Sequence, residues 1–220
     1  MSRFTDALAT AAARGDRPRA PPPVPNVRPP RFEAEMRTLR SQLQGLLEAR
    51  SPLLISVSAC NSGEGASLVS QELARSLALD GHEVLLCGAS DGVGGPPTPP
   101  RSERKVVATK IPALSFLDIS DLHRPGAKLK TLIALRDWLE TAKAAYDVVI
   151  VDTPPILNQG GWETMLRVQD GTILLMEAER TRAQVLKATI SAVEAAGGHI
   201  LGIVFNRRKQ YIPTFIYRWL

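Results

Sequence analysis

The strongest constraint on the fold of this chain is the regular alternation of short apolar runs with longer segments of helical length. Six apolar runs of strand length occupy residues 53–58, 83–87, 113–119, 147–151, 171–176 and 199–205. Segments with helical length and periodicity lie among them at 66–80, 128–145 and 181–197. Unbroken apolar runs are typical of strands buried on both faces, and their alternation with helices favours parallel pairing. The sequence therefore predicts an α/β fold, a parallel sheet with helices on both faces.

Composition divides the chain into three parts. Residues 1–31 are rich in Pro and Arg and are predicted to be disordered, because proline removes backbone donors that helices and sheets need. Residues 32–206 are predicted to form the α/β domain, starting with a helix over 32–49 whose apolar residues share one stripe. Residues 207–220 form a basic, aromatic tail. Within the domain, the Gly- and Pro-rich segment 88–104 is expected to be a mobile loop.

Charge and hydropathy limit the cellular compartments and the kinds of binding partner that we expect for this chain. The net charge is +5, and the excess of bases lies at the two ends, whereas the stretch between them is mildly acidic. This distribution favours an acidic partner or an anionic membrane surface over nucleic acid. No apolar run has the length of a membrane-spanning helix, and the 2 cysteines are too few for a disulfide framework. We therefore expect a cytoplasmic protein that binds no nucleic acid.

A glycine-containing loop follows the first predicted strand. Two glycines in this loop can adopt tight-turn backbone angles and point amide hydrogens inward, and a helix begins directly after them. A strand, a glycine loop and a helix N-terminus together form a site for phosphate. The residues expected to contact a phosphate-bearing cofactor are Ser62, Gly63, Glu64, Gly65, Ala66 and Ser67.

A second candidate is Asp152, at the end of the buried run in YDVVIVDTPPIL. The carboxyl ends of strands are where α/β folds place ligands, and a carboxylate there can hold a magnesium-bound water. We predict that Asp152 is the catalytic carboxylate of any reaction at this site, and that it shares a Mg²⁺ ion with Ser67.

Several segments of the chain resemble the cytoplasmic kinase domain of bacterial tyrosine kinases, the capsule and exopolysaccharide family. The resemblance covers about residues 33–206 and lies in EMRTLRSQL, SGEGAS, VLLCGAS, YDVVIVDTPPIL, DGTILLMEAERT and LGIVFNRR. It implies a P-loop NTPase-like fold of the deviant Walker A branch, which also includes septum-site and chromosome-partitioning ATPases. It also implies ATP and magnesium as cofactors.

The chain differs from active members of the family at positions that support phosphoryl transfer. Active members have Lys where this chain has Ala66, and Asp at the positions of Gly88 and Ser90. Phosphoryl transfer depends on positioned positive charge and magnesium around the transferred group. We therefore expect a degenerate, mainly non-catalytic member in which ATP and Mg²⁺ bind weakly or not at all.

The resemblance also implies a pathway and partners. It predicts a regulator or scaffold in exopolysaccharide or capsule synthesis or export that acts with an inner-membrane polysaccharide co-polymerase, or chain-length protein, and is held at that membrane through it. The subunit-contact motif of the family, Glu-x-x-Arg-x-x-Arg, reads Ala34-x-x-Arg37-x-x-Arg40 in this chain. Arg37 and Arg40 are therefore the candidate contacts of a homo-oligomer, but assembly of a ring through the complete motif is not expected. The C-terminal tyrosine cluster of the family corresponds to Tyr211 and Tyr217, the candidate phosphorylation sites.

Two other interpretations remain open from the sequence. The first is an active ATP-dependent tyrosine autokinase that uses a displaced cation such as Lys105, Lys110 or Arg180. The second is a partitioning-type ATPase-like protein that binds DNA or membrane, and the acidic body of the chain argues against DNA.

Overall fold

The computed structural model describes residues 30–89, 106–123 and 128–206. Its centre is a seven-stranded sheet in the order β3-β4-β2-β5-β1-β6-β7. Every neighbouring pair is parallel except β3 and β4, which are antiparallel. The strands are β1 Leu53–Ala59, β2 Val84–Gly88, β3 Val106–Ala108, β4 Leu114–Asp118, β5 Val148–Asp152, β6 Gly171–Glu177 and β7 Ile200–Asn206.

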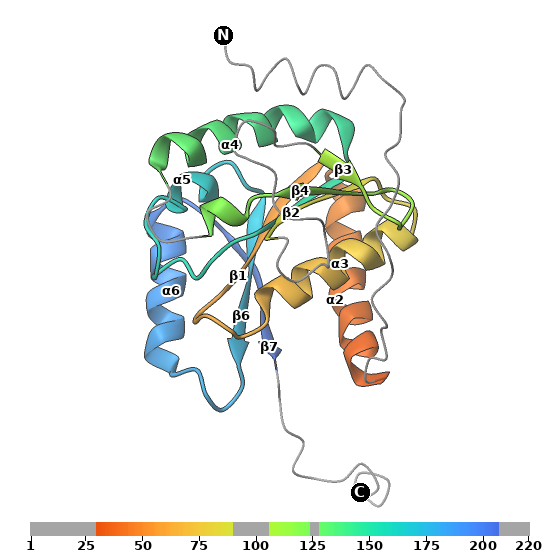
Figure 1. Ribbon diagram of the computed structural model, residues 1–220. Coiled ribbons are helices and arrows are strands. Elements are labelled where there is room, and N and C mark those ends of the chain that lie inside the picture. The colour runs from red at the N-terminus through yellow and green to blue at the C-terminus, as the bar shows by residue number, and fades with distance from the viewer. Residues whose placement is uncertain (1–29, 90–105, 124–127, 207–220) are drawn as a thin grey trace, which may run out of the picture.

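Helices cover both faces of this sheet. Figure 1 shows α2 and α3 on one side of the sheet and α4, α5 and α6 on the other. Their bounds are α2 Pro30–Ala49, α3 Ala66–Leu79, α4 Leu129–Ala142, α5 Glu163–Leu166 and α6 Ala183–Ala195. Short 3-10 helices occupy Ser120–Leu122 and Lys143–Ala145. The predicted fold class is confirmed.

The core explains why the apolar runs are unbroken. All seven residues of β1 are buried. Leu53, Ile55 and Val57 belong to the apolar cluster that includes α2 and α3 residues. Leu54, between them, belongs to the cluster on the opposite face with α4. Because successive side chains of a strand point to opposite faces, a strand covered on both sides is apolar at every position.

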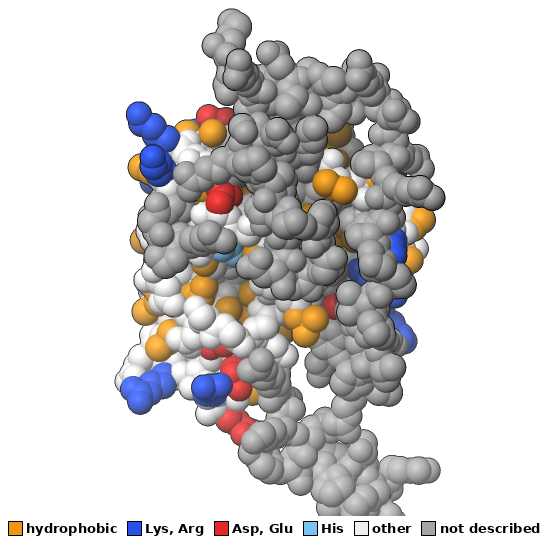
Figure 2. Space-filling view, viewed as in Figure 1, with side chains coloured by type: hydrophobic (Ala, Val, Ile, Leu, Met, Phe, Trp, Pro, Cys, Tyr) orange, Lys and Arg blue, Asp and Glu red, His pale blue; other side chains and the backbone are white. Residues whose placement is uncertain are grey.

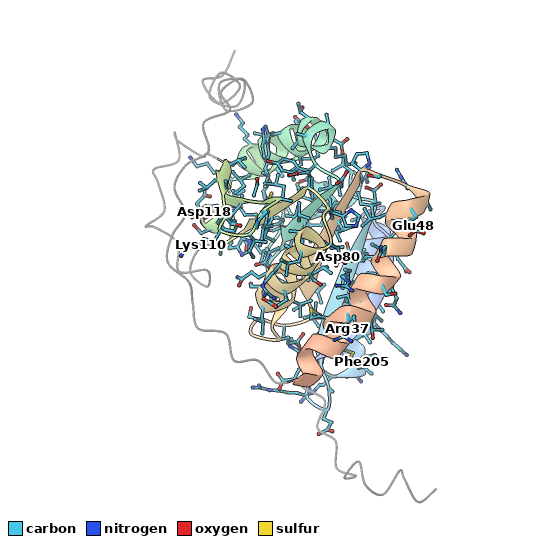
Figure 3. The ribbon with its side chains drawn as sticks, turned by 90° about the vertical axis from the view of Figure 1, so that its right-hand side faces the viewer. Arg37, Glu48, Asp80, Lys110, Asp118 and Phe205 are labelled. Carbon is cyan, nitrogen blue, oxygen red and sulfur yellow. The ribbon has the colours of Figure 1, made fainter. Side chains whose placement is uncertain are left out.

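The long N-terminal helix is part of this core. Met36, Leu43 and Leu47 of α2 are buried against the sheet and α3. An ion pair also joins the two helices. Arg40 Nε of α2 lies 2.9 Å from Oδ2 of Asp80, at the end of α3. Figure 3 shows Asp80 between α3 and α2, with Arg37 and Glu48 along α2.

The predicted strands all form, each within one residue of its expected bounds. The helix expected over 32–49 begins at Pro30, where proline is tolerated in a first helical turn. Neither β3 nor α5 was predicted, because elements of 3 and 4 residues leave no periodic signal.

Parts of the predicted organisation lie outside the described residues. These are residues 1–29 of the Pro/Arg-rich segment, residues 90–104 of the expected loop, and the tail 207–220. Among the helices that the structure describes, none combines the length and apolar character needed to cross a bilayer.

Candidate phosphate-binding site

The glycine loop connects β1 to α3 at the carboxyl end of the sheet. Gly63 and Gly65 both have left-handed backbone angles, with φ of +83° and +100°. Gly65 is the N-cap residue of α3, and no side chain in the described part of the chain caps that helix end. The first amide groups of α3 are therefore left for water or a ligand, and the helix dipole favours a negative charge there. The backbone geometry fits a phosphate group.

A neighbouring strand holds the loop in this shape. Asn206, the last residue of β7, donates a hydrogen bond from Nδ2 to the backbone oxygen of Glu64 at 2.6 Å. A Cβ atom at position 65 would lie 2.5 Å from the same Nδ2 atom. Glycine is thus required at position 65 both for its positive φ and for the close approach of Asn206.

The side chain of Glu64 forms a second tether. It is only 3% exposed. Its Oε1 accepts hydrogen bonds from Asn61 Nδ2 at 2.7 Å and from Thr181 Oγ1 at 2.5 Å. Its Oε2 is buried and has no hydrogen-bond partner among the described residues. The side chains that hold the loop through these bonds, Asn61, Thr181 and Asn206, carry no charge, so none of them supplies a cation at the loop.

Asp152 ends β5 beside this loop and is 3% exposed. Burial raises the pKa of its carboxyl group above the usual value, and hydrogen bonds from Ser67 and Ser70 and the nearby His123 oppose that rise. The His123 ring also meets the Asp152 backbone, with Nε2 at 2.9 Å from the carbonyl oxygen. The structure thus brings together Ser67 and Asp152, the two residues predicted to share a magnesium ion.

The positions where acids and a lysine are missing can also be located. Gly88 ends β2, and a Cβ atom there would lie 3.4 Å from Asp152 Cβ and 3.7 Å from Asp152 Oδ2. These are ordinary contacts, so an acidic side chain at position 88 would stand next to Asp152. Ala66 begins α3 and packs against the core. The loop geometry therefore suits phosphate, whereas these two positions lack the charges that suit ATP with magnesium.

Three basic residues, Lys105, Lys110 and Arg180, were considered as substitutes for the lysine that is missing at position 66, and they differ in where they lie. Lys110 follows β3, which runs antiparallel to β4 with Ala108 beside Ser115, so Lys110 lies toward the amino end of the sheet, away from the loop. Arg180 is exposed and approaches Glu177, with Nη1 at 3.5 Å from Oε2. Lys105 lies outside the described residues. The topology thus removes Lys110 as a substitute for the missing lysine.

The remaining predicted site residues fall on other surfaces. Arg37 is exposed on α2, whereas Arg40 is engaged within the chain by Asp80 and by Ser76, whose Oγ lies 3.4 Å from Nη1. Arg40 therefore contributes to the packing of α2 on α3. Tyr211 and Tyr217 lie outside the described residues, as does Ser90.

Sequence reasoning missed Asn206, Thr181, Ser70 and His123. Asn206 stands in the motif LGIVFNRR, but no spacing rule relates that segment to a loop more than 140 residues upstream. Thr181 and His123 lie in connections between elements, where apolar periodicity carries no information.

Comparison with known proteins identifies several proteins with similar sequences. No family model matches the chain. EpsB of Ralstonia nicotianae, named as a tyrosine-protein kinase, is 28% identical over 188 residues, which are 78% of this chain and 25% of EpsB. The tyrosine-protein kinase YwqD of Bacillus subtilis is 25% identical over 191 residues, covering 80% of this chain and 81% of YwqD. The chain thus spans about a quarter of the length of EpsB and most of the length of YwqD.

Solved structures show the same fold. The kinase domain of the Escherichia coli tyrosine kinase ETK superposes with a TM-score of 0.65 and 19% identity, over 81% of this chain and 78% of that domain. The cell division protein MinD of Aquifex aeolicus gives a TM-score of 0.54 and 16% identity, over 71% and 70% of the two chains. The chain therefore has the P-loop fold of the ETK kinase domain and of MinD, and the sequence relatives EpsB and YwqD are named as tyrosine-protein kinases.

Proposed function

We propose that this chain is a degenerate member of the bacterial tyrosine kinases of capsule and exopolysaccharide synthesis, and that it acts as a non-catalytic regulator or scaffold. The observation that carries the proposal is the charge of the site. The loop has phosphate-binding geometry, yet Ala66 begins its helix and Gly88 faces Asp152. The relatives that support the pathway include EpsB and a kinase named from the cps region of Klebsiella pneumoniae.

The physical argument concerns the transition state. A transferring phosphoryl group spreads negative charge over its oxygens, and the enzyme stabilises it with fixed positive charge and magnesium. One charge-assisted hydrogen bond contributes about 1.5–3 kcal/mol, so its loss weakens nucleotide binding by roughly tenfold to a hundredfold. The remaining groups are the loop amides, Ser67 and Asp152. They support weak binding of ATP and Mg²⁺ without efficient transfer.

Calorimetric titration with ATP and MgCl₂ tests this proposal directly. The wild-type protein is expected to give little or no heat, whereas the variant Ala66→Lys, which restores the missing cation, is expected to bind. The matched control is Ala66→Gln, which adds a long side chain without charge. Micromolar binding by the wild-type protein that disappears in Asp152→Ala would contradict the proposal.

Tyrosine phosphorylation gives a second readout. Incubation with ATP and Mg²⁺ is expected to leave Tyr211 and Tyr217 unmodified in the wild-type protein, as measured by mass spectrometry. Phosphate on either tyrosine that depends on Asp152 would establish an active autokinase with a displaced cation, for which Arg180 and Lys105 remain the candidates.

The proposed partner is an inner-membrane polysaccharide co-polymerase, or chain-length protein, that holds this chain at the membrane. The exposed Arg37 on α2 is a candidate contact for that partner or for a second copy of the chain. Co-purification with the co-polymerase from detergent-solubilised membranes is expected, and Arg37→Glu is expected to reduce the yield of the complex. An unchanged yield in that variant would exclude this surface.

A further inference from the structure

The strand β7 forms one edge of the described sheet, and that edge is long and uncharged. Its seven residues, ILGIVFN, include no charged side chain and no proline. The strand at the opposite described edge, β3, has only 3 residues. The outer N–H and C=O groups of a long edge strand can pair with another strand, and proteins protect such edges with charges, proline or a covering segment. An edge like that of β7 is therefore expected to be covered.

The hydrogen bonds to β6 show which backbone groups of β7 point outward. The carbonyl oxygen of Asn206 accepts a bond from N of Ala178, which follows β6, at 2.9 Å. Successive residues of a strand direct their backbone groups to opposite sides, and the register with β6 is regular beyond one bulge near the start of β7. Val204 therefore faces β6, whereas the N–H and C=O groups of Ile203 and Phe205 point away from it. No described strand pairs with that side of β7.

The side chains along this edge are incompletely covered as well. Phe205 is 55% exposed. A Cβ atom at Gly202 would meet nothing within 4 Å, so the space beside that residue is open. Val204 is only partly buried against the apolar cluster of α2 and α3, and Ile203 only partly buried against the cluster on the opposite face. One more strand would extend both apolar layers beyond β7.

The chain continues from this edge with a segment of suitable composition, which lies outside the described residues. Asn206 is followed by RRKQ at 207–210 and then by YIPTFIY at 211–217, in which every residue except the proline is β-branched or aromatic. Such residues favour strands. A connection of 207–210 has the length of a hairpin loop, and so short a tether gives an effective concentration on the order of 1 mM. The tether favours this segment over a strand from a second copy of the chain.

The position of Pro213 fits an antiparallel pairing with β7. With 207–210 as the connection, Pro213 falls opposite Val204, and Thr214 falls opposite Ile203. Because the backbone groups of Val204 face β6, the residue opposite it needs no N–H group to pair with β7. The missing donor of the proline is therefore tolerated, and Thr214 can exchange both hydrogen bonds with Ile203.

The side chains that meet in this register are also complementary. Ile212 falls opposite Phe205, whose ring is exposed without it. Phe215 falls opposite Gly202, where the space is open. Apolar cross-strand pairs stabilise a sheet, and an aromatic ring across from an edge glycine compensates for its missing side chain.

We propose that residues 211–217 add a further strand to the sheet, antiparallel to β7, with residues 207–210 as the turn. The C-terminal segment of the chain thereby covers the apolar edge of its own domain. Tyr211 and Tyr217 are part of this strand, so a kinase that phosphorylates them must first release it from β7. The inference does not depend on whether the glycine loop binds nucleotide.

Hydrogen exchange followed by NMR on the full chain resolves the single amides that test this pairing. The amides of Ile203 and Phe205 are expected to exchange at least about tenfold more slowly than unpaired amides, though faster than those of β1, because the added strand is itself an edge that opens locally. The amide of Val204, which faces β6, is the internal reference. Exchange of Ile203 and Phe205 at the rate of unpaired amides, with Val204 protected, would overturn the proposal.

Two neighbouring substitutions separate strand pairing from loose apolar contact. Thr214→Pro removes a donor that the pairing needs, so the amide of Ile203 is expected to exchange at least about tenfold faster than in the wild-type protein. Pro213→Thr is the matched control, because the restored N–H points away from β7 and the protection of Ile203 should remain. Unchanged protection of Val204 in both variants shows that the sheet is intact. Equal exchange of Ile203 in the two variants would refute the pairing.

Dilution distinguishes the chain's own segment from a second copy. Protection of Ile203 by an intramolecular strand is expected to stay constant when the protein concentration changes about a hundredfold, whereas pairing between copies weakens on dilution. Hydrogen exchange measured by mass spectrometry on the peptide that contains β7, together with light scattering, gives both readouts. Protection that disappears on dilution as a dimer dissociates would assign the edge to a second copy and overturn the proposal.

Discussion

At the scale of single residues, the candidate site is defined by a buried carboxyl group whose surroundings offset its loss of water only in part. Asp152 is held by the hydroxyls of Ser67 and Ser70, and burial raises its pKa because the charged form loses water. In kinases that use magnesium, an ion would offset that loss. In this chain, the same carboxyl group is predicted to lower the stability of the protein near neutral pH.

The first prediction concerns Asp152→Asn. Because the folded-state pKa is raised above 3.8, the contribution of Asp152 to stability is greatest below that pH and is lost as the pH rises through the folded-state value. The variant is therefore expected to unfold at a higher temperature than the wild-type protein at pH 7, with a difference that vanishes below pH 3.8. Thermal unfolding in EDTA across this range measures it. A less stable variant at pH 7 would mean that the charged form has a favourable partner.

The second prediction concerns Gly88→Asp. The new carboxylate would stand beside Asp152 and repel it, so the variant is expected to be less stable than the wild-type protein without metal. Addition of MgCl₂ should then raise its unfolding temperature more than that of the wild-type protein. Gly160→Asp is the control, because a Cβ atom at that glycine meets nothing within 4 Å. Equal responses to magnesium in the two variants would show that no metal site was restored.

At the scale of elements, α2 is held on α3 by apolar burial more than by charge. Leu43 is 3% exposed, whereas the side chains of Arg40 and Asp80 are 29% and 27% exposed. A partly exposed ion pair contributes up to about 1 kcal/mol to the free energy of unfolding. Burial of a leucine side chain contributes about 1.5–3 kcal/mol, which is more than the ion pair contributes.

A set of three substitutions tests this ranking. Leu43→Ala is expected to lower the free energy of unfolding by about 2–5 kcal/mol, because it leaves a cavity. Arg40→Gln is expected to lower it by less than about 1 kcal/mol. Leu46→Ala, at a neighbouring position that is 40% exposed, serves as the control and should cost less than Leu43→Ala. Urea denaturation measures all three. A larger loss in Arg40→Gln than in Leu43→Ala would reverse the ranking.

The elements also show how far sequence reasoning reaches. The long strands were predictable because both faces of the sheet are covered, which makes each strand an unbroken apolar run. The strand β3 was not, since Val106–Ala108 pairs with β4 alone among the described strands and owes its conformation to that contact. In the site, Gly63, Gly65 and Asp152 were identified by local pattern. Asn206 and Thr181, which reach the loop from distant segments, depend on the folded sheet.

At the scale of the whole molecule, we expect the protection of backbone amides against hydrogen exchange to depend on the position of each strand in the sheet. β1 lies between β5 and β6 and is fully buried, whereas β7 lies at an edge and each of its residues is partly or fully exposed. On the face shown in Figure 2, apolar side chains of the described residues are scattered among polar ones. The least stable strands are therefore expected at the sheet edges.

Hydrogen exchange measured by mass spectrometry tests this expectation. Amides of β1 and β5 should exchange only through global unfolding, whereas those of β3 and β7 should exchange faster, through local opening. Faster exchange in β1 than in β7 would show that the sheet opens from its centre.

The central place of β1 has a consequence for biosynthesis. Leu53 pairs with Val148 and Ile55 with Gly171, so β1 is translated long before the two strands with which it pairs. The glycine loop that follows β1 forms its contact with Asn206 later still, because Asn206 lies at the end of β7. A nascent chain on the ribosome consequently cannot hold the glycine loop in its final shape until Asn206 has left the exit tunnel.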